Sequence, residues 1–293
     1  MIDTTVRDGL RDEWVIGQES AATGATYRFG IDRWFAWCDA QGVEVFAARR
    51  ADVDRYRHAL LNSVSRRTLA KNLSIISAFY RHVVQEGDTL LEHNPVQNVR
   101  RPKVARTSKR EGLTAQEART LRAASLERGP RTAALVHVLL GTAVRVSEAV
   151  GARTDALGWW DGDRVLHVVR KGGADARLVI QPADWAVLER YLATRAEVAE
   201  RWLLATTGGR RMSRQTAYRE IRELADSVVV RKRIGPHALR RTAATLALDA
   251  GQPIQEVQAL LGHASSATTQ LYDSELANRG RSASRALGAV YGA

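Results

Sequence analysis

The sequence predicts a mainly α-helical protein of two domains that carries one small antiparallel β-sheet. Apolar residues recur at helical spacing through residues 20–99 and again after Glu111, and a basic stretch with two prolines separates the two regions. In the second region, "GDRVLHVVRKGGADARLVIQP" is typical of two short strands joined by a turn. The chain of 293 residues is long enough for two domains with separate cores.

The first predicted domain, residues 20–99, is expected to contain three helices. The first, "TGATYRFGIDRWFAWCDAQG", aligns aromatic and aliphatic residues on one side and ends at Gly42, and "ADVDRYRHALLNS" is the second. The third, "SRRTLAKNLSIISAFYRHVVQEG", has an apolar stripe and closes at Gly87. Residues 1–19 are expected to form an N-terminal extension that is too short to fold as a separate domain.

Two basic clusters belong to this half of the chain. The opening of the third helix carries cations away from its apolar stripe, and residues 100–110 form a basic interdomain linker. The basic side chains at the start of the helix either form a solvated surface or contact phosphates. The linker is either a solvated tether or part of a clamp around a duplex. The candidate DNA-binding residues in these segments are Arg66, Arg67, Lys71, Arg100, Arg101 and Lys103.

The second predicted domain spans residues 111–275, and a tail covers 276–293. The domain opens with a capping box, in which Thr114 caps a helix and Glu117 lies three residues on. The apolar helix in "PRTAALVHVLLGTAVRVSEAV" is expected to break around Gly141. The tail has sparse apolar residues, which indicate either a frayed terminus or a docked segment.

Charge and composition narrow the class of protein. Lys and Arg outnumber Asp and Glu by 44 to 32, which gives a net charge of +12 and favours a polyanionic partner such as nucleic acid. A high-GC coding bias would also enrich Arg. The single cysteine, Cys38, excludes a disulfide framework and a cysteine metal cluster. The sequence has no apolar run of transmembrane length and no signal-peptide pattern, so we expect a cytoplasmic protein.

Two cations stand at predicted element boundaries in the second domain. Arg145 follows a buried apolar helix, where a lone guanidinium is costly unless it is paired. Ser147 is expected to cap the next helix, and Glu148 is close enough to orient Arg145, although this pair also fits a purely structural role. Lys171 lies at the tip of the predicted hairpin and is either a surface lysine or a functional cation.

The stretch "HALRRTAATLALDAG" raises a question of charge. His237, Arg240 and Arg241 crowd the start of a helix that begins at Pro236, where the helix dipole disfavours cations. A bound anion at that helix start would offset the cost. Two further candidates follow: His263 comes after the helix-ending "LLG", and Tyr272 lies nine residues later.

The order of these residues resembles that of the tyrosine recombinase, or phage integrase, family. The matching pieces are "GTAVRVSEA", the hairpin lysine, "HALRRTAATLALDAG", "LLGH" and "TTQLY", and the likeness extends over about residues 20–275. The resemblance implies a helical core-binding (SAM-like) domain and a catalytic domain that form a C-shaped clamp on DNA. The short extension suggests an Xer-like recombinase or a compact phage or mobile-element integrase without an arm-binding domain.

The same resemblance implies the site and the partners. Arg145 and Arg240 would hold a scissile phosphate, Tyr272 would attack it, and Lys171 would protonate the leaving 5′ oxygen. The implied catalytic set is Arg145, Lys171, His237, Arg240, His263 and Tyr272, with Glu148 in support and Arg241 as a DNA contact. No cofactor or metal is implied. The family acts on double-stranded DNA core sites, as a tetramer whose C-terminal tails pack on neighbouring protomers.

Two departures and two alternatives stay open at this point. Ala238 stands where many family members carry an acidic residue, and Arg170 precedes Lys171 and could change which hairpin cation is used. A type IB topoisomerase-like DNA relaxing enzyme would use the same covalent chemistry. A catalytically idle DNA-binding module would have the same excess of positive charge. Integration, excision and resolution of a DNA element are all compatible with the sequence.

Overall fold

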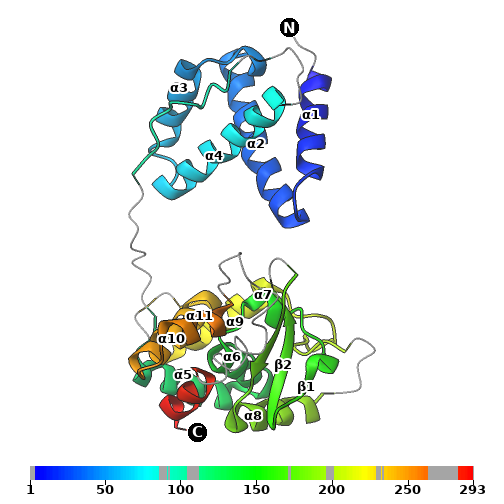
Figure 1. The fold of residues 1–293 in the computed structure, drawn as a ribbon, viewed down its shortest axis with the longest axis vertical. Coiled ribbons are helices and arrows are strands. Elements are labelled where there is room, and N and C mark those ends of the chain that lie inside the picture. Colours follow the sequence, from blue (N-terminus) through cyan, green and yellow to red (C-terminus); the bar gives the residue numbers. More distant parts are fainter. Residues whose placement is uncertain are drawn as a thin grey trace. The chain divides into compact units, whose positions relative to one another are not determined.

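The chain divides into two compact units, residues 1–108 and 109–293, each with its own core. The computed structural model describes residues 4–85, 91, 93–103, 112–170, 173–195, 201–228, 232, 234–262 and 283–292. Within these residues, helices dominate both units and the strands belong to the second (Figure 1). No helix in the described ranges is both long and apolar enough to span a membrane.

The N-terminal unit consists of four helices. They are α1 (Thr4–Ile16), α2 (Ala21–Gln41), α3 (Arg50–Leu60) and α4 (Arg66–Gln85), with a short 3-10 turn, η1, at Val45–Ala47. Helices α2, α3 and α4 confirm the three predicted ones. Gly42 ends α2 in the left-handed conformation, with φ of 62°, as expected of a helix stop. The predicted stop at Gly87 lies outside the described residues.

Helix α1 corrects the expectation that residues 1–19 are an extension and that the first helix begins near residue 20. Trp14, which is 6% exposed, packs against Tyr27 and Phe79 with ring centroids 5.0 and 5.4 Å apart. Arg11 also donates to Asp32 of α2 at 3.0 Å. The helix is therefore part of this unit's core rather than an appendage.

The C-terminal unit surrounds one apolar helix with further helices and a sheet. Its helices are α5 (Ala115–Arg128), α6 (Pro130–Thr142), α7 (Val146–Ala149), α8 (Pro182–Ala193), α9 (Arg214–Ser227), α10 (Pro236–Asp249) and α11 (Ile254–Leu261), with a 3-10 turn, η2, at Thr154–Ala156. Helix α6 is buried along most of its length and contacts α5, α8 and α10. The predicted capping box is confirmed, because Thr114 and Glu117 bond to each other's backbone N–H groups.

The sheet is antiparallel and has three strands among the described residues, one more than the sequence predicted. Its order is β1 (Leu157–Trp160), β2 (Asp163–Val169) and β3 (Asp175–Val179). Leu166 in the central strand faces Leu157 on one side and Leu178 on the other. The inner face of β2 thereby joins the core through Leu166, which is fully buried.

The break after α6 falls at Ala143, two residues beyond the expected position. Ala143 adopts the left-handed conformation with φ of 52°, whereas Gly141 is still helical. A Cβ on Gly141 would lie 2.1 Å from Oδ2 of Asp184, so the glycine permits a close approach by α8. That carboxylate also accepts hydrogen bonds from Arg122 at 2.7 Å and from His137 at 2.9 Å.

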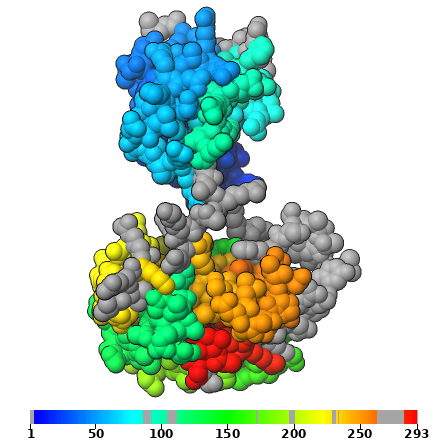
Figure 2. Space-filling view, turned by 90° about the vertical axis from the view of Figure 1, so that its left-hand side faces the viewer, coloured from blue at the N-terminus to red at the C-terminus, as the bar shows by residue number. Residues whose placement is uncertain are grey.

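The C-terminal residues 283–291 form a helix that packs on their own unit. Ala283 and Leu287 are fully buried, the hydroxyl of Tyr291 donates to the carbonyl of Leu140 at 3.3 Å, and Arg122 lies over the Tyr291 ring. Figure 2 shows this red segment against green and orange parts of the same unit. The tail was expected on a neighbouring protomer, and in this structure its described part packs within its own chain.

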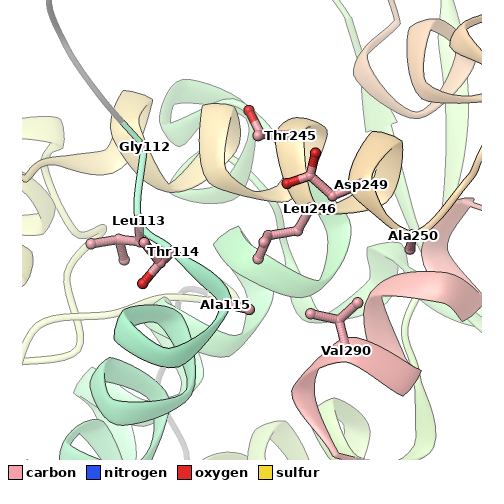
Figure 3. Close-up of a pocket in the computed structure, with 9 residues that line it drawn as sticks. All are labelled: Gly112, Leu113, Thr114, Ala115, Thr245, Leu246, Asp249, Ala250 and Val290. Atoms are coloured by element: carbon pink, nitrogen blue, oxygen red, sulfur yellow. The ribbon is translucent and has the colours of Figure 1, made fainter.

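A pocket of about 410 Å³ lies beside this helix (Figure 3). Its lining comes from the start of α5, from α10 and from Val290 of the C-terminal helix. Leu113 and Leu246 make much of this wall apolar. None of the predicted site residues lines this pocket.

Candidate active site

Arg145 stands at the turn between the apolar helix α6 and the short helix α7. Its backbone N–H donates to Oε2 of Glu148 at 3.0 Å, and its Nη1 donates to Oε1 of the same carboxylate at 2.8 Å. The prediction that Glu148 orients Arg145 is confirmed. Ser147 was expected to cap α7, but Arg145 occupies the cap position and Glu148 makes the capping bond, so that expectation was wrong.

The two side chains of this ion pair differ in their exposure to solvent. The side chain of Glu148 is 7% exposed, whereas that of Arg145 is 33% exposed. The carboxylate therefore anchors one edge of the guanidinium from inside the protein. Because the side chain of Arg145 is a third exposed, an anion can approach its guanidinium from the solvent.

Arg240 lies under the same turn and is only 5% exposed. Its Nη1 donates to the carbonyl of Ala143 at 2.5 Å, and its Nη2 donates to the carbonyl of Leu261 at the end of α11. The side chain thus ties α10 to the end of α6 and to the end of α11, both of which α10 contacts (Figure 1).

The position of Arg240 also answers the question of charge at this helix. Helix α10 begins at Pro236, so only His237 lies in its first turn, and Arg240 and Arg241 lie in the second. The helix dipole acts mainly within the first turn. The penalty for Arg240 comes instead mainly from burial. Burial, assisted by Arg145 and Arg170 and opposed by Glu148, lowers the pKa of Arg240 to about 10.

Arg170 joins this group from the end of β2. Its Nη2 donates to the carbonyl of Leu260 at 3.1 Å, next to the carbonyl that Arg240 holds. Burial lowers its pKa, with Arg145 acting in the same direction and Glu148 against it. The sequence indicated Arg170 only as a residue that could change the hairpin cation, since its contact with α11 joins positions 90 apart.

We call these four residues the arginine cluster: Arg145, Arg170, Arg240 and Glu148. The cluster brings three guanidinium groups to one carboxylate, which leaves an excess of positive charge in a partly buried site. Such an arrangement is suited to a dianionic or monoanionic phosphate, which matches guanidinium donors in pairs.

The remaining predicted catalytic residues differ in what can be said of them. His237 is exposed in the first turn of α10, three residues before Arg240. Lys171, His263 and Tyr272 lie outside the described residues. Helix α11 ends at Gly262, which has φ of 57°, so the predicted stop directly before His263 is confirmed.

The predicted DNA-binding residues of the N-terminal unit are on its surface. Arg66, Arg67 and Lys71 are exposed on α4, whose buried face carries the predicted apolar stripe. Arg101 is also exposed, and its Nη1 donates to Ser74 of α4 at 2.5 Å, which holds the start of the linker against that helix. Arg100 and Lys103 are exposed as well, and the rest of the linker, from residue 104, lies outside the described residues.

The described residues present no group of three or more His, Cys, Asp or Glu side chains that could hold a metal ion. The chemistry that the arginine cluster itself offers is electrostatic. Its fixed N–H donors are placed to stabilise negative charge on phosphate oxygens, which is where charge grows when a phosphodiester is attacked.

Comparison with known proteins agrees with this fold. Residues 111–279 match the model of the Phage integrase family. The chain is 30% identical over 265 residues to the tyrosine recombinase XerD of Chlorobaculum tepidum, which covers 86% of each protein. It is also 30% identical over 274 residues to the tyrosine recombinase XerC of Azotobacter vinelandii, covering 90% of this chain and 88% of that protein.

Solved structures show the same fold. A lambda integrase (75–356) dimer bound to a COC′ core site aligns with a TM-score of 0.71 at 17% identity, over 88% of this chain and 95% of that one. The Tn1549 transposon integrase in complex with circular intermediate DNA aligns with a TM-score of 0.71 at 14% identity, over 91% and 97%.

A helical protein with a small antiparallel sheet and a cluster of guanidiniums fits the class of DNA strand-transfer enzymes. The chain belongs to the phage integrase family of tyrosine recombinases. It is accordingly an enzyme of site-specific DNA recombination, as the sequence resemblance predicted.

Proposed function

We propose that this enzyme cuts and rejoins DNA strands through a 3′-phosphotyrosyl intermediate formed by Tyr272. The observation that carries the proposal is the convergence of Arg145 and Arg240. Arg145 bonds to Glu148, and Arg240 of α10 bonds to the carbonyl of Ala143, just after α6, and to that of Leu261 in α11. Two guanidiniums held in this way would bind the non-bridging oxygens of one scissile phosphate. Each fixed donor is worth on the order of 10²–10³ in rate.

The covalent step follows from the chemistry of the proposed residues. The phenolic oxygen of Tyr272 bonds to phosphorus, the bond from phosphorus to the 5′ oxygen breaks, and Lys171 gives that oxygen a proton. His237 assists removal of the phenolic proton, which is necessary because a phenol with a pKa near 10 is mostly protonated at neutral pH. His263 donates a further hydrogen bond to the phosphate.

Rejoining reverses these steps with a different strand. A 5′-hydroxyl attacks the phosphotyrosyl phosphorus, the bond to Tyr272 breaks, and the phenol recovers its proton. Because the covalent intermediate keeps the energy of the broken bond, no nucleotide cofactor is needed.

DNA binding is proposed to involve both units. The N-terminal unit, α1 included, would form the core-binding domain, and the C-terminal unit the catalytic domain, with Arg241 adding a contact. The proposed contacts of the first unit with backbone phosphates are Arg66, Arg67, Lys71, Arg100, Arg101 and Lys103. A lambda integrase tetramer bound to a Holliday junction has a similar fold, with a TM-score of 0.71. A tetramer on DNA is therefore the proposed working assembly, for integration, excision or resolution of an element.

Covalent capture tests the proposal and identifies the DNA site in the same experiment. The full-length protein is incubated with a library of random-sequence duplexes and then denatured, and DNA attached to protein is recovered and sequenced. We expect one enriched core sequence and a DNA-modified peptide containing Tyr272. The matched variant Tyr272→Phe should bind duplex DNA equally well and give no adduct, and adducts that persist in it would refute the assignment.

A further inference from the structure

Arg170 uses only part of its hydrogen-bonding capacity. Its Nη2 bonds to the carbonyl of Leu260, but Nε and Nη1 are buried and have no hydrogen-bond partner among the described residues. Buried donors are almost always paired in folded proteins. A guanidinium with two unpaired buried donors therefore indicates a missing acceptor.

The side chain is also held in place rather than free to swing into water. The backbone N–H of Arg170 donates to the carbonyl of Ala174 at 2.8 Å, which fixes its base at the end of β2. At its far end, a Cβ on Gly262 would lie 1.6 Å from Nη1 and 2.5 Å from Cδ, so Arg170 passes directly over that glycine. The glycine thus leaves the space that the guanidinium occupies.

The surroundings of Arg170 point to an anion as the missing acceptor. Glu148 is the carboxylate that acts on Arg170, and its oxygens already bond to Arg145. Arg145 and Arg240 both lie within electrostatic range of Arg170, and Arg240 holds the carbonyl adjacent to the one that Arg170 holds. Three cations that share one carboxylate repel each other until a further negative charge enters.

We propose that Arg170 is a third guanidinium ligand of the scissile phosphate, alongside Arg145 and Arg240. The inference rests on the proposed function for the identity of the anion, whereas the need for an anion comes from Arg170's own contacts. Arg170 donates its unpaired N–H groups to the phosphate and stabilises the charge that develops on its oxygens during attack.

A first experiment measures anion binding independently of strand cleavage. The melting temperature of full-length Arg170→Met is compared with that of the wild type, with and without inorganic phosphate. The matched control is Arg177→Met, which changes an exposed arginine on the neighbouring strand β3. We expect Arg170→Met to melt at or above the wild-type temperature without phosphate, because repulsion is relieved, and to lose most of the phosphate-induced rise.

A second experiment tests the chemistry on the duplex recovered by covalent capture. We expect Arg170→Met to form adducts at least tenfold more slowly than Arg177→Met, because a hydrogen bond to a charged group is lost. The difference should disappear when the scissile phosphate is replaced by a neutral methylphosphonate, and it should persist when the methylphosphonate is placed one nucleotide away.

The outcomes separate this proposal from the proposed function. If covalent capture with the wild type recovers no adduct, the proposed function is refuted, and the phosphate-dependent melting then decides the role of Arg170 alone. A lower melting temperature of Arg170→Met with a full phosphate response would identify a structural residue and overturn the inference. An equal rate defect on charged and neutral scissile groups would overturn it as well.

Discussion

The C-terminal unit contains two clusters of buried charge that are built in opposite ways. In one, Arg122 and His137 both bond to Asp184, and all three side chains are nearly inaccessible to solvent. In the other, the arginine cluster, the buried Glu148 bonds to Arg145, and Arg170 and Arg240 lie within its electrostatic range. In the first cluster both side chains bond directly to Asp184, although Nη1 of Arg122 and Nε2 of His137 have no hydrogen-bond partner among the described residues. The second cluster has three guanidiniums and one carboxylate.

The difference shows how a folded protein separates structural charge from functional charge. Asp184 joins α5, α6 and α8, so its ion pairs hold the unit together, and Arg122 also lies over Tyr291 of the C-terminal helix. We propose that a phosphate balances the charge of the arginine cluster. Substitutions in the first cluster should therefore cost stability, and those in the second should cost chemistry.

The largest expected effect belongs to Asp184→Ala. It leaves Arg122 buried without its carboxylate, which should lower the free energy of unfolding by about 3–5 kcal/mol. Urea denaturation followed by circular dichroism measures this change. The control is Asp226→Ala, which removes an exposed partner of Arg222 and should cost less than about 1 kcal/mol. Equal losses in the two variants would erase the distinction between the clusters.

The next largest effect is on catalysis, from Arg240→Ala. It should slow adduct formation on the captured duplex by about 10²–10³. Arg222→Ala removes an arginine that is paired on the surface of the same unit and should react at the wild-type rate. A decrease of less than about tenfold in Arg240→Ala would contradict the assignment of Arg240 to the phosphate.

Glu148→Gln should have an intermediate effect that is confined to the rate. The amide keeps an oxygen for Arg145 but not the charge that strengthens the bond, so we expect adduct formation at saturating DNA to fall about tenfold. Gel-shift titration should give nearly unchanged duplex affinity. If affinity falls as much as the rate, Glu148 supports DNA binding in general rather than the orientation of Arg145.

The smallest expected effect comes from replacing two glycines, of which only one lies against Arg170. Gly262→Ala and Gly251→Ala each place a side chain at positive φ, 57° and 82°, and each should lose about 1–2 kcal/mol of stability. Only Gly262→Ala also displaces Arg170, because Gly251 has no atom within 4 Å of its new Cβ. We expect only Gly262→Ala to lose the phosphate-induced rise in melting temperature. An equal loss in both variants would show that this rise does not depend on Arg170.

Local sequence patterns predicted the features that depend on neighbouring residues. The stop of α2 at Gly42, the capping box of α5 and the pairing of Arg145 with Glu148 each involve residues one to four positions apart. The backbone geometry of a helix end is set within one turn, so short motifs carry enough information to predict it.

Features that depend on distant contacts escaped prediction. Helix α1 was missed although Val6, Leu10 and Trp14 recur at helical spacing. What fixes it in the unit is contact with α2, such as Arg11 with Asp32 and Asp12 with Arg28. Strand β1 was missed because its four residues form a strand only by pairing with β2. The role of Arg170 depends on α11, which lies far along the chain.

The central claim is that the arginine cluster holds the phosphate that Tyr272 attacks. The most direct test is a crystal structure of Tyr272→Phe bound to the captured duplex. The account predicts non-bridging oxygens of the scissile phosphate within about 3 Å of guanidinium nitrogens of Arg145 and Arg240. A scissile phosphate bound elsewhere, with these guanidiniums still facing only Glu148, Ala143 and Leu261, would contradict it.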